Sequence, residues 1–433
     1  MGSNYTMFKR FVFIILLLQT GFIIFAAKAN AQATASDTLK LTIKQAEDLF
    51  LKNNLQLIIQ RYNIDNANAM VITARLFPNP DFNFSNGIHS NDATEGPAYK
   101  DHSAGISQLF TTAGKRNKNI QLAKLSAEQA KYQFFDLLRT LKFTLRNDFY
   151  TIYFQQQSAK VYDQEITSLA KALTVFKEQY KKGNVAEKEV LRIQSQLYTL
   201  QAEYNNLQTG IDTVQSEFKL LTKTPANTTI QPQTDYNIEG KAVVAGVPYK
   251  TLLDSAYANR YDLKLAKSAV DYNNINLQLQ KATAVPDVSL SLNYDKLGSY
   301  GTNFLGAGIG FSLPFFNRNQ GGIKQARIAI DQSKVQLQSQ QDHIESDVAT
   351  NYKNALRLES LYNSFDPAFK NDFIHLIQEV FKNYEKRNLS LLEFLDFYDS
   401  YKTNTLQLNT LQLNRVTSLE QLNYVTGTPF FNQ

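Results

Sequence analysis

Cysteine is absent from this chain of 433 residues, and so is tryptophan. Without cysteine the protein forms no disulfide, binds no metal through a thiolate and uses no cysteine nucleophile. It also lacks the acylated cysteine that anchors a lipoprotein. Tyrosine and phenylalanine, by contrast, are abundant, with 23 and 29 residues.

Catalytic and nucleotide-binding motifs are also missing. The histidines are scattered without the spacing of metal ligands: His89, His102, His343 and His375. No phosphate-binding loop, nucleophile elbow or paired-carboxylate cleft is recognisable. The alternating Gly306, Gly308 and Gly310 belong to a strand pattern, because no helix follows them at once. We expect neither an enzyme nor a bound cofactor or metal.

The net charge of +6 is spread along the sequence and not clustered. Scattered charges of this kind are typical of solvated helix faces and do not indicate a nucleic-acid partner. The length of 433 residues alone favours two or three domains.

The only long apolar run lies at the N-terminus. Lys9 and Arg10 precede apolar residues 11–25, and Ala29-Asn30-Ala31 follows. This order of a charged region, a short apolar region and an A-x-A site is typical of a secretory signal peptide. We expect residues 1–31 to be a signal peptide that is cleaved after Ala31. No later segment is a transmembrane helix candidate. If the exported protein enters a membrane, it must therefore do so with β-strands.

The longest stretch without glycine or proline covers residues 115–182. Its second half carries apolar or aromatic residues at alternating steps of three and four, the pattern of a coiled-coil seam: Ala159, Tyr162, Ile166, Leu169, Leu173, Phe176 and Tyr180. A helix of this length would extend roughly 100 Å. Lys182-Gly183-Asn184 then predicts a tight turn, and a second uninterrupted run follows over residues 185–209, so we expect a long helical hairpin.

The sequence repeats itself with an offset of about 205 residues. Tyr180 aligns with Tyr384, and Glu189 aligns with Glu393. The matches keep one order along almost the whole mature chain, which favours an internal repeat over two unrelated helical halves. We expect a first repeat at residues 32–224, a linker or small subdomain at 225–248 and a second repeat at 249–433.

Each predicted repeat begins with a helix, over residues 41–77 and 249–284. In the second repeat, the long helix is expected to run from 323 toward 385, with a kink at Pro367 because proline removes a helical hydrogen bond. A turn at 385–390 and a returning helix at 391–424 complete the second hairpin.

Between the first helix and the hairpin, each repeat carries a predicted strand pair. The first pair is expected at residues 81–88 and 103–110, with a polar loop at 89–102. In the second pair, apolar side chains alternate with small or polar ones: Val288, Leu290, Leu292, Ile309 and Phe311. Such a face suits a membrane barrel with lipid outside, and it also suits a soluble sheet packed on one side.

The signal peptide and the lack of other core material favour the barrel. Four strands cannot close one, because open edges in lipid would leave backbone groups unsatisfied. Three chains with four strands each would give twelve. We therefore expect a mainly α-helical protein that also contributes to a membrane β-barrel.

The element order, together with short motifs, resembles the TolC family of trimeric outer-membrane channels over essentially the whole mature chain. Residues 391–396, Leu-Leu-Glu-Phe-Leu-Asp, resemble the family signature Leu-Leu-Asp-x-Leu-Asp at the tunnel mouth. Residues 180–183 resemble its Tyr-x-x-Gly turn. Residues 107–110 and 114–116 are similar to the heavy-metal branch of the family. The second turn departs from the pattern, with Arg387 in place of glycine and Leu389 where some members carry an arginine.

The resemblance implies a homotrimer in the outer membrane, with a twelve-stranded barrel in lipid and a helical barrel in the periplasm. It implies a passive efflux channel for drugs or metal cations, served by a periplasmic adaptor and an inner-membrane pump, often of the resistance-nodulation-division type. A protein-secretion duct of the same fold stays open as an alternative, and so does a structural periplasmic coiled-coil protein.

The resemblance also assigns roles to residues near the two turns. It implies an acidic ring at the pore entrance, formed by Glu393, Asp396 and Asp399. Glu189 and Tyr384 are the expected gate, with a hydrogen bond from the tyrosine to the carboxylate. The expected adaptor-docking tips are the two turns: Lys182, Gly183 and Asn184 in the first, and Arg387, Asn388 and Leu389 in the second.

Overall fold

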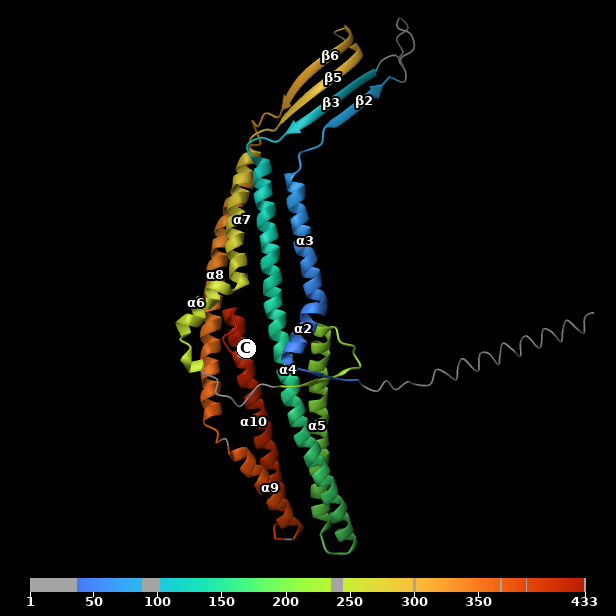
Figure 1. Ribbon diagram of the computed structural model, residues 1–433, viewed down its shortest axis with the longest axis vertical. Helices are drawn as coiled ribbons and strands as arrows, with labels where there is room; N and C mark the ends of the chain where they lie inside the picture. The colour runs from blue at the N-terminus through green and yellow to red at the C-terminus, as the bar shows by residue number, and fades with distance from the viewer. Residues whose placement is uncertain are drawn as a thin grey trace, which may run out of the picture.

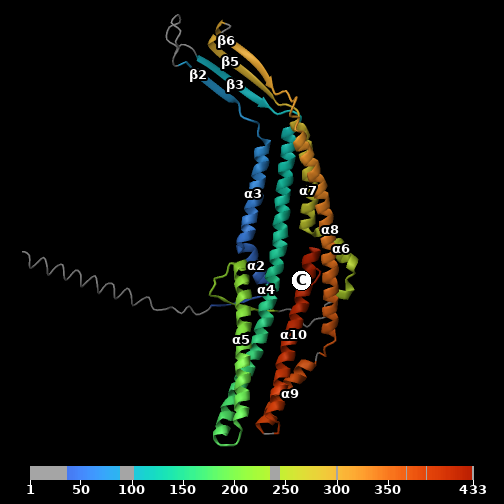
Figure 2. The same cartoon turned by 180° about the vertical axis from the view of Figure 1, so that it is seen from behind.

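A computed structural model describes residues 37–87, 102–234, 244–298, 301–366, 368–386 and 388–431. These residues form a long helical rod with a small sheet at one end and two helical hairpin tips at the other (Figure 1). The view from behind shows the same separation of sheet and tips (Figure 2). The predicted signal peptide at 1–31 lies outside the described residues, as does the predicted loop at 89–102 apart from His102, which begins a strand.

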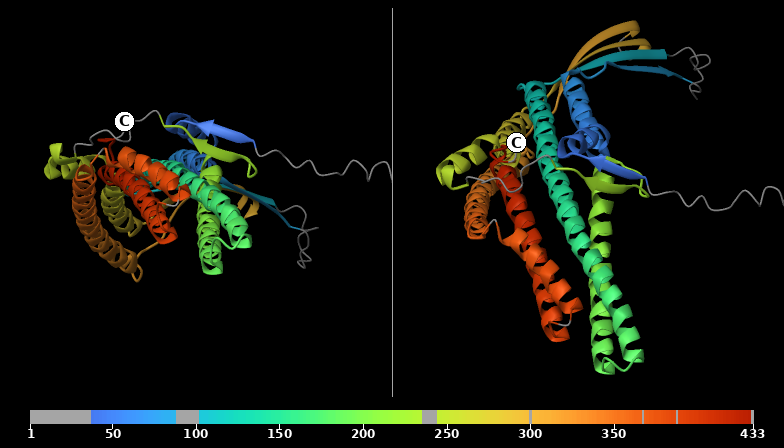
Figure 3. Two further views of the ribbon diagram at one scale, coloured as in Figure 1. Left: turned by 90° about the horizontal axis from the view of Figure 1, so that it is seen from below. Right: turned by 60° about the horizontal axis from the view of Figure 1, so that its bottom comes forward.

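The first half of the chain contains two short helices, two strands and a long hairpin: α2 (Ile43–Asn53), α3 (Leu55–Arg75), β2 (Asp81–Asn86), β3 (His102–Phe110), α4 (Lys115–Lys181) and α5 (Glu187–Thr222). The second half repeats this order with one more helix: α6 (Tyr249–Asn259), α7 (Tyr261–Thr283), β5 (Val288–Gly298), β6 (Gly301–Phe311), α8 (Gln320–Asn363), α9 (Phe369–Glu385) and α10 (Leu391–Thr426). Both hairpins project toward the same end, away from the sheet (Figure 3).

The prediction of one very long helix is confirmed by α4, which has 67 residues without interruption. Its seam residues Leu169 and Leu173 are buried against α5, where they pack with Ile193 and Leu197. Tyr180, at the end of the predicted seam, is exposed, because the seam extends past the last turn of packed core.

The prediction of a single helix over residues 41–77 is wrong, because α2 and α3 are separated at Asn54. The Asn54 side chain accepts a hydrogen bond from the backbone N–H of Leu57 and donates one to the carbonyl of Leu221, at 3.0 and 2.9 Å. This cap lets α2 turn and bury Phe50 completely. Asparagine is a favoured N-cap, so the side chain replaces the helical hydrogen bond that is lost.

The corresponding helix of the second half is also interrupted, at Arg260, although residues 249–284 were predicted to be continuous. Arg260 is buried, and its guanidinium donates to Asp262 and Asp347, at shortest distances of 2.6 and 3.1 Å. It also donates to the carbonyl of Val425 at 3.4 Å. The interruption thus positions a buried ion pair against the end of α10.

The long helix of the second half is broken and not merely kinked. Helix α8 ends at Asn363 and α9 begins at Phe369. Pro367 itself lies outside the described residues, but its chemistry accounts for the end of α8, because proline has no N–H to donate to the carbonyl four residues earlier. That carbonyl belongs to Asn363. The side chain of Asp366 accepts a hydrogen bond from the N–H of Ala368 at 2.9 Å.

The four predicted strands form one antiparallel sheet in the order β2-β3-β5-β6. Strands β5 and β6 have 11 residues each, whereas β2 has six. Leu290 pairs with Ile309, and Val288 pairs with Phe311, so the predicted apolar residues share one face. The sheet is open, with β2 and β6 at its edges.

The segment predicted to link the repeats contains structure that the sequence did not indicate. Strand β4 (Thr229–Pro232) pairs in parallel with β1 (Thr38–Leu41) near the N-terminus. A short 3-10 helix, η2 (Val244–Gly246), follows. Ile230 of β4 is fully buried and joins the core of the first half, with Phe149 and Phe218. The segment therefore connects the N-terminal strand to the helical core of the first half, in the middle of the rod.

Candidate functional site

The first hairpin tip is a tight turn built on glycine. Gly183 has a φ of 75°, in the left-handed region, and the predicted tight turn is confirmed. Its N–H donates to the carbonyl of Tyr180 at 2.9 Å, and the N–H of Asn184 donates to the carbonyl of Gln179 at 3.0 Å. Lys182 and Asn184 are exposed beside it. A Cβ at position 183 would meet no atom within 4 Å, so only the backbone conformation demands glycine there.

The second tip is held by a helix cap. Ser390 is the N-cap of α10 and forms a capping box with Glu393: the Ser390 N–H donates to the Glu393 carboxylate at 2.9 Å, and the Glu393 N–H donates to Ser390 Oγ at 3.3 Å. Arg387, predicted as a tip residue, lies outside the described residues. Asn388 is exposed, whereas Leu389 packs against the apolar cluster between the hairpins.

A stack of aromatic rings joins the two hairpins just inside the tips. Tyr384 of α9 lies between Phe176 of α4 and Phe394 of α10, with ring centroids 5.8 and 4.1 Å away and interplanar angles of 8° and 13°. Phe394 is fully buried and also contacts the ring of Tyr398. The stack therefore fixes the two hairpins to each other by apolar contact.

The predicted hydrogen bond from Tyr384 to Glu189 is not formed. The Tyr384 hydroxyl is buried and has no hydrogen-bond partner within the described part of the chain. Burial, and secondly the negative charge of Glu189, raises the pKa of Tyr384 above its ordinary value. Stacking with Phe176 and Phe394 determines the position of the Tyr384 ring. The hydroxyl group does not help to hold the ring in place.

The three predicted ring carboxylates are exposed on the first turns of α10. Hydrogen bonds from the backbone and side chain of Ser390 lower the pKa of Glu393 below its ordinary value, so this carboxylate stays charged in mild acid. Asp396 follows one turn later. Asp399 forms an ion pair with Lys402 at 3.2 Å. Glu393 thus combines a negative charge with a role in ending the turn.

The apolar face of the sheet is bare in the single chain. Ile309 is 68 % exposed and Leu292 is 53 % exposed. The same face continues onto β2 and β3, where Phe82 pairs with Ile106. On the other face, Ser291 pairs with Gly308 and Asn293 pairs with Gly306. A row of large exposed apolar side chains over four strands indicates a surface that another apolar phase covers.

An ionic cluster that the sequence did not reveal lies where α4, α5 and α10 meet, with Glu165 and Lys402 buried in it. The Lys402 ammonium lies 3.2 Å from the carboxylates of both Glu203 and Asp399. Glu165 of α4 is only 3 % exposed beside them. A signal was present, because Glu165 lies three residues after Tyr162 and four before Leu169, on the apolar seam of the helix.

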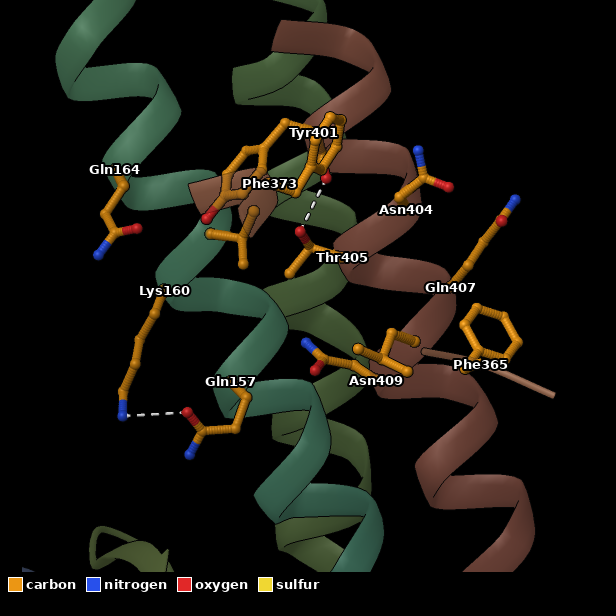
Figure 4. Close-up of a pocket in the computed structure, with 12 residues that line it drawn as sticks. Gln157, Lys160, Gln164, Phe365, Phe373, Tyr401, Asn404, Thr405, Gln407 and Asn409 are labelled. Carbon is orange, nitrogen blue, oxygen red and sulfur yellow. Dashed lines mark hydrogen bonds between the residues drawn. The ribbon is translucent and has the colours of Figure 1, made fainter. Parts of the chain in front are cut away.

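A groove of about 260 Å³ lies next to this cluster, between α4 and α10 (Figure 4). The rings of Tyr401 and Phe373 lie next to each other in its lining, with centroids 5.9 Å apart and planes inclined by 49°. Amide side chains dominate the rest of the lining, including Gln164, Asn404 and Gln407. Phe365, in the interruption between α8 and α9, and Phe373 of α9 both line the groove.

The described residues contain neither a metal site nor a membrane-spanning helix. No group of three or more histidine, aspartate or glutamate side chains there could hold a metal ion. None of the described helices combines the length and apolarity needed to cross a membrane.

Comparison with known proteins extends over nearly the whole rod. The sequence profile of the outer membrane efflux protein family matches residues 47–221 and 252–428. No curated protein sequence matches the chain significantly. Solved structures match in fold at low identity, as shown by three examples.

The CmeC outer membrane channel of Campylobacter jejuni has a TM-score of 0.71 at 15 % identity, over 90 % of this chain and 86 % of its own. A membrane protein from Pseudomonas aeruginosa has a TM-score of 0.73 at 14 % identity, over 90 % and 94 % of the two chains. The open-state MtrE outer membrane channel of Neisseria gonorrhoeae has a TM-score of 0.69 at 17 % identity, over 89 % of each chain. With the profile covering both halves of the rod, the chain belongs to the outer membrane efflux protein family and is an efflux channel of the outer membrane that extends into the periplasm.

Proposed function

We propose that three copies of this chain form one continuous duct across the outer membrane and the periplasm. The open four-stranded sheet with a bare apolar face carries the proposal. In lipid the unpaired backbone groups of β2 and β6 would be costly. Pairing β6 of one chain with β2 of the next removes both edges, and three chains close a barrel of twelve strands with threefold symmetry.

In this assembly Val288, Leu290, Leu292, Ile309 and Phe311 face lipid, and the small and polar face lines water. The helical hairpins form the periplasmic part of the duct. A periplasmic adaptor docks at the two tips, and an inner-membrane pump of the resistance-nodulation-division type supplies the energy. The chain itself conducts passively and does no chemistry. The adaptor and the pump type rest on the family resemblance.

At the entrance, Glu393, Asp396 and Asp399 form an acidic ring. The exposure of these side chains on α10 is compatible with this role. Threefold symmetry places the carboxylates from three chains around one narrow opening, where the electric field is focused. Such a ring favours cations over anions. The stack around Tyr384 and the nearby Glu189 form the gate that holds the hairpins together.

The barrel is tested by charge placement on its two faces. Ile309→Arg puts a charge into lipid at a cost of about 2–4 kcal/mol near the midplane. Ser291→Arg, on the opposite face of the neighbouring strand, should assemble. We expect native mass measurements in detergent to give three chains for the wild type and for Ser291→Arg, with reduced trimer for Ile309→Arg. A wild-type monomer, or equal assembly of both variants, would overturn the barrel.

A further inference from the structure

The buried carboxylate of Glu165 is the starting point. It lies on α4 where α5 and α10 meet, and only 3 % of the residue is exposed. Its Oε1 atom accepts no hydrogen bond from any described residue. A charged carboxylate that is buried without a dedicated partner is costly, and such a group tends to bind a proton instead.

The groups around Glu165 come from all three helices. Helix α10 contributes one cation, one carboxylate and two phenols, whereas α5 contributes a carboxylate and α4 a phenol: Lys402, Asp399, Tyr398, Tyr401, Glu203 and Tyr162. Lys402 already forms ion pairs with Asp399 and Glu203. With Glu165 ionised, three carboxylates would share one ammonium group.

The protonation of Glu165 follows from this setting. Burial raises the pKa of Glu165 to about 8, the charge of Lys402 opposes the shift, and Asp399 and Glu203 add to it. The carboxyl group therefore holds its proton at neutral pH in the arrangement seen here. If α10 moves away and water enters, the pKa returns toward its ordinary value and the proton is released.

The position of Glu165 gives this proton a mechanical role. The residue lies on the side of α4 that meets α10, between the aromatic stack at the tips and the groove at the end of α8. The other helix of the second hairpin is interrupted between Asn363 and Phe369, so α9 is not continued by α8, whereas α10 runs past this level without a break. Contacts with α4 and α5, such as the ion pair of Lys402 with Glu203, hold α10 at this level.

We propose that Glu165 is a proton-controlled latch between the two hairpins: the protonated side chain keeps α10 packed on α4, and loss of the proton loosens the second hairpin and widens the entrance. The latch rests on the proposed function, because it assigns the moving hairpins to a channel entrance. The ligand of this site is a proton. The carboxyl group that binds it belongs neither to the acidic ring nor to the gate.

The direction of the pH effect is fixed by linkage. The packed state has the higher pKa and binds the extra proton, so its stability is full below the ordinary pKa of a glutamate and falls as the pH rises toward 8. Above that value both states are ionised and no further change follows. One proton changes the ratio of loosened to packed hairpins by at most about tenfold per pH unit.

Asp148 provides a matched control. This carboxylate of α4 is also buried, and burial raises its pKa to about 8. Its charged neighbour, Glu217, lies on α5 of the same hairpin. Loss of a proton from Asp148 therefore affects packing within the first hairpin, whereas loss of one from Glu165 affects packing between the hairpins.

The test is a distance measurement on the full-length trimer. Because the chain has no cysteine, two can be introduced at the exposed Lys188 of the first hairpin and Leu392 of the second and then spin-labelled. We expect the distance distribution between the labels to lengthen from pH 5 to pH 8 and to stay constant above it. Glu165→Gln should keep the pH 5 distribution throughout, and Asp148→Asn should respond as the wild type does.

A wild-type distance that does not change with pH would overturn the latch, and so would a full response in Glu165→Gln. If Glu165→Gln fails to assemble, Glu165→Leu serves the same purpose, since an apolar side chain of similar size is tolerated well at buried ionic sites. The distance requires no conduction. A pH response in a trimer that conducts nothing in planar bilayers would reject the proposed function alone, whereas a conducting trimer without it would reject the latch alone.

Discussion

The two hairpins have the same place in the repeat but are supported differently. In the first, α4 runs without interruption for 67 residues from the sheet to the tip. In the second, the corresponding path is divided into α8 and α9, and α10 alone runs past the break without interruption. A continuous helix transmits position from the membrane to the tip, whereas a divided one leaves the tip to be positioned by its neighbours. The proposed latch therefore makes the first hairpin the fixed wall and the second the movable one.

The turns at the two hairpin tips are also stabilised differently. The first depends on the backbone freedom of Gly183, which has a positive φ and no crowding around it. The second depends on side chains, through the capping box of Ser390 and Glu393. One turn is thus sensitive to residues that resist a positive φ, β-branched ones above all, and the other is sensitive to the loss of particular polar atoms.

The largest effect is expected from interrupting α4 with a proline, as Pro367 interrupts the path of α8 and α9. Asp163 is the exposed repeat counterpart of Pro367 on α4. Asp163→Pro should destabilise the helix by about 3 kcal/mol or more, because it removes a hydrogen bond and clashes with the preceding turn. Asp163→Ala is the control and should be close to the wild type. Thermal unfolding of the trimer measures the effect, and equal melting temperatures would refute the view of α4 as a rigid wall.

A smaller effect is expected at the first turn. Gly183→Val forces a β-branched residue into the left-handed region at a cost of roughly 1–2 kcal/mol. Because nothing surrounds the position, the trimer should form while the turn changes shape and the adaptor no longer docks. Gly183→Asn, which tolerates this conformation, is the control. Efflux from whole cells should fall for valine and persist for asparagine, and normal efflux with Gly183→Val would remove the docking role.

Local signals explain which parts of the fold the sequence could predict. The seam of α4, the alternation in β5 and β6, and the glycine of the first turn each depend on neighbours within a few residues. The interruptions at Asn54 and Arg260 could not be predicted with the same ease, because each depends on a distant partner, Leu221 in one case and Asp347 in the other. The pairing of β1 with β4 likewise joins segments about 190 residues apart.

The candidate site shows the same division. The acidic side chains of α10 were identified from a short motif, and the structure adds that Glu393 also caps its helix. The hydrogen bond expected from Tyr384 was wrong, because the sequence did not reveal the rings above and below it. Glu165 was passed over as one polar residue in a long helix. Its environment is set by the charges of Lys402 and Glu203, which form an ion pair and lie on other helices.

Ion conduction through the trimer tests the proposed duct most directly. Its entrance should lie at the tips and be lined by the acidic residues of the second hairpin. In planar bilayers the wild type should select cations and be blocked by a trivalent cation from the periplasmic side. The double variant Glu393→Gln, Asp396→Asn removes two charges per chain and keeps the cap, since glutamine also serves in a capping box. It should remain a trimer and lose both the selectivity and the block, whereas a trimer that retained both would contradict the account.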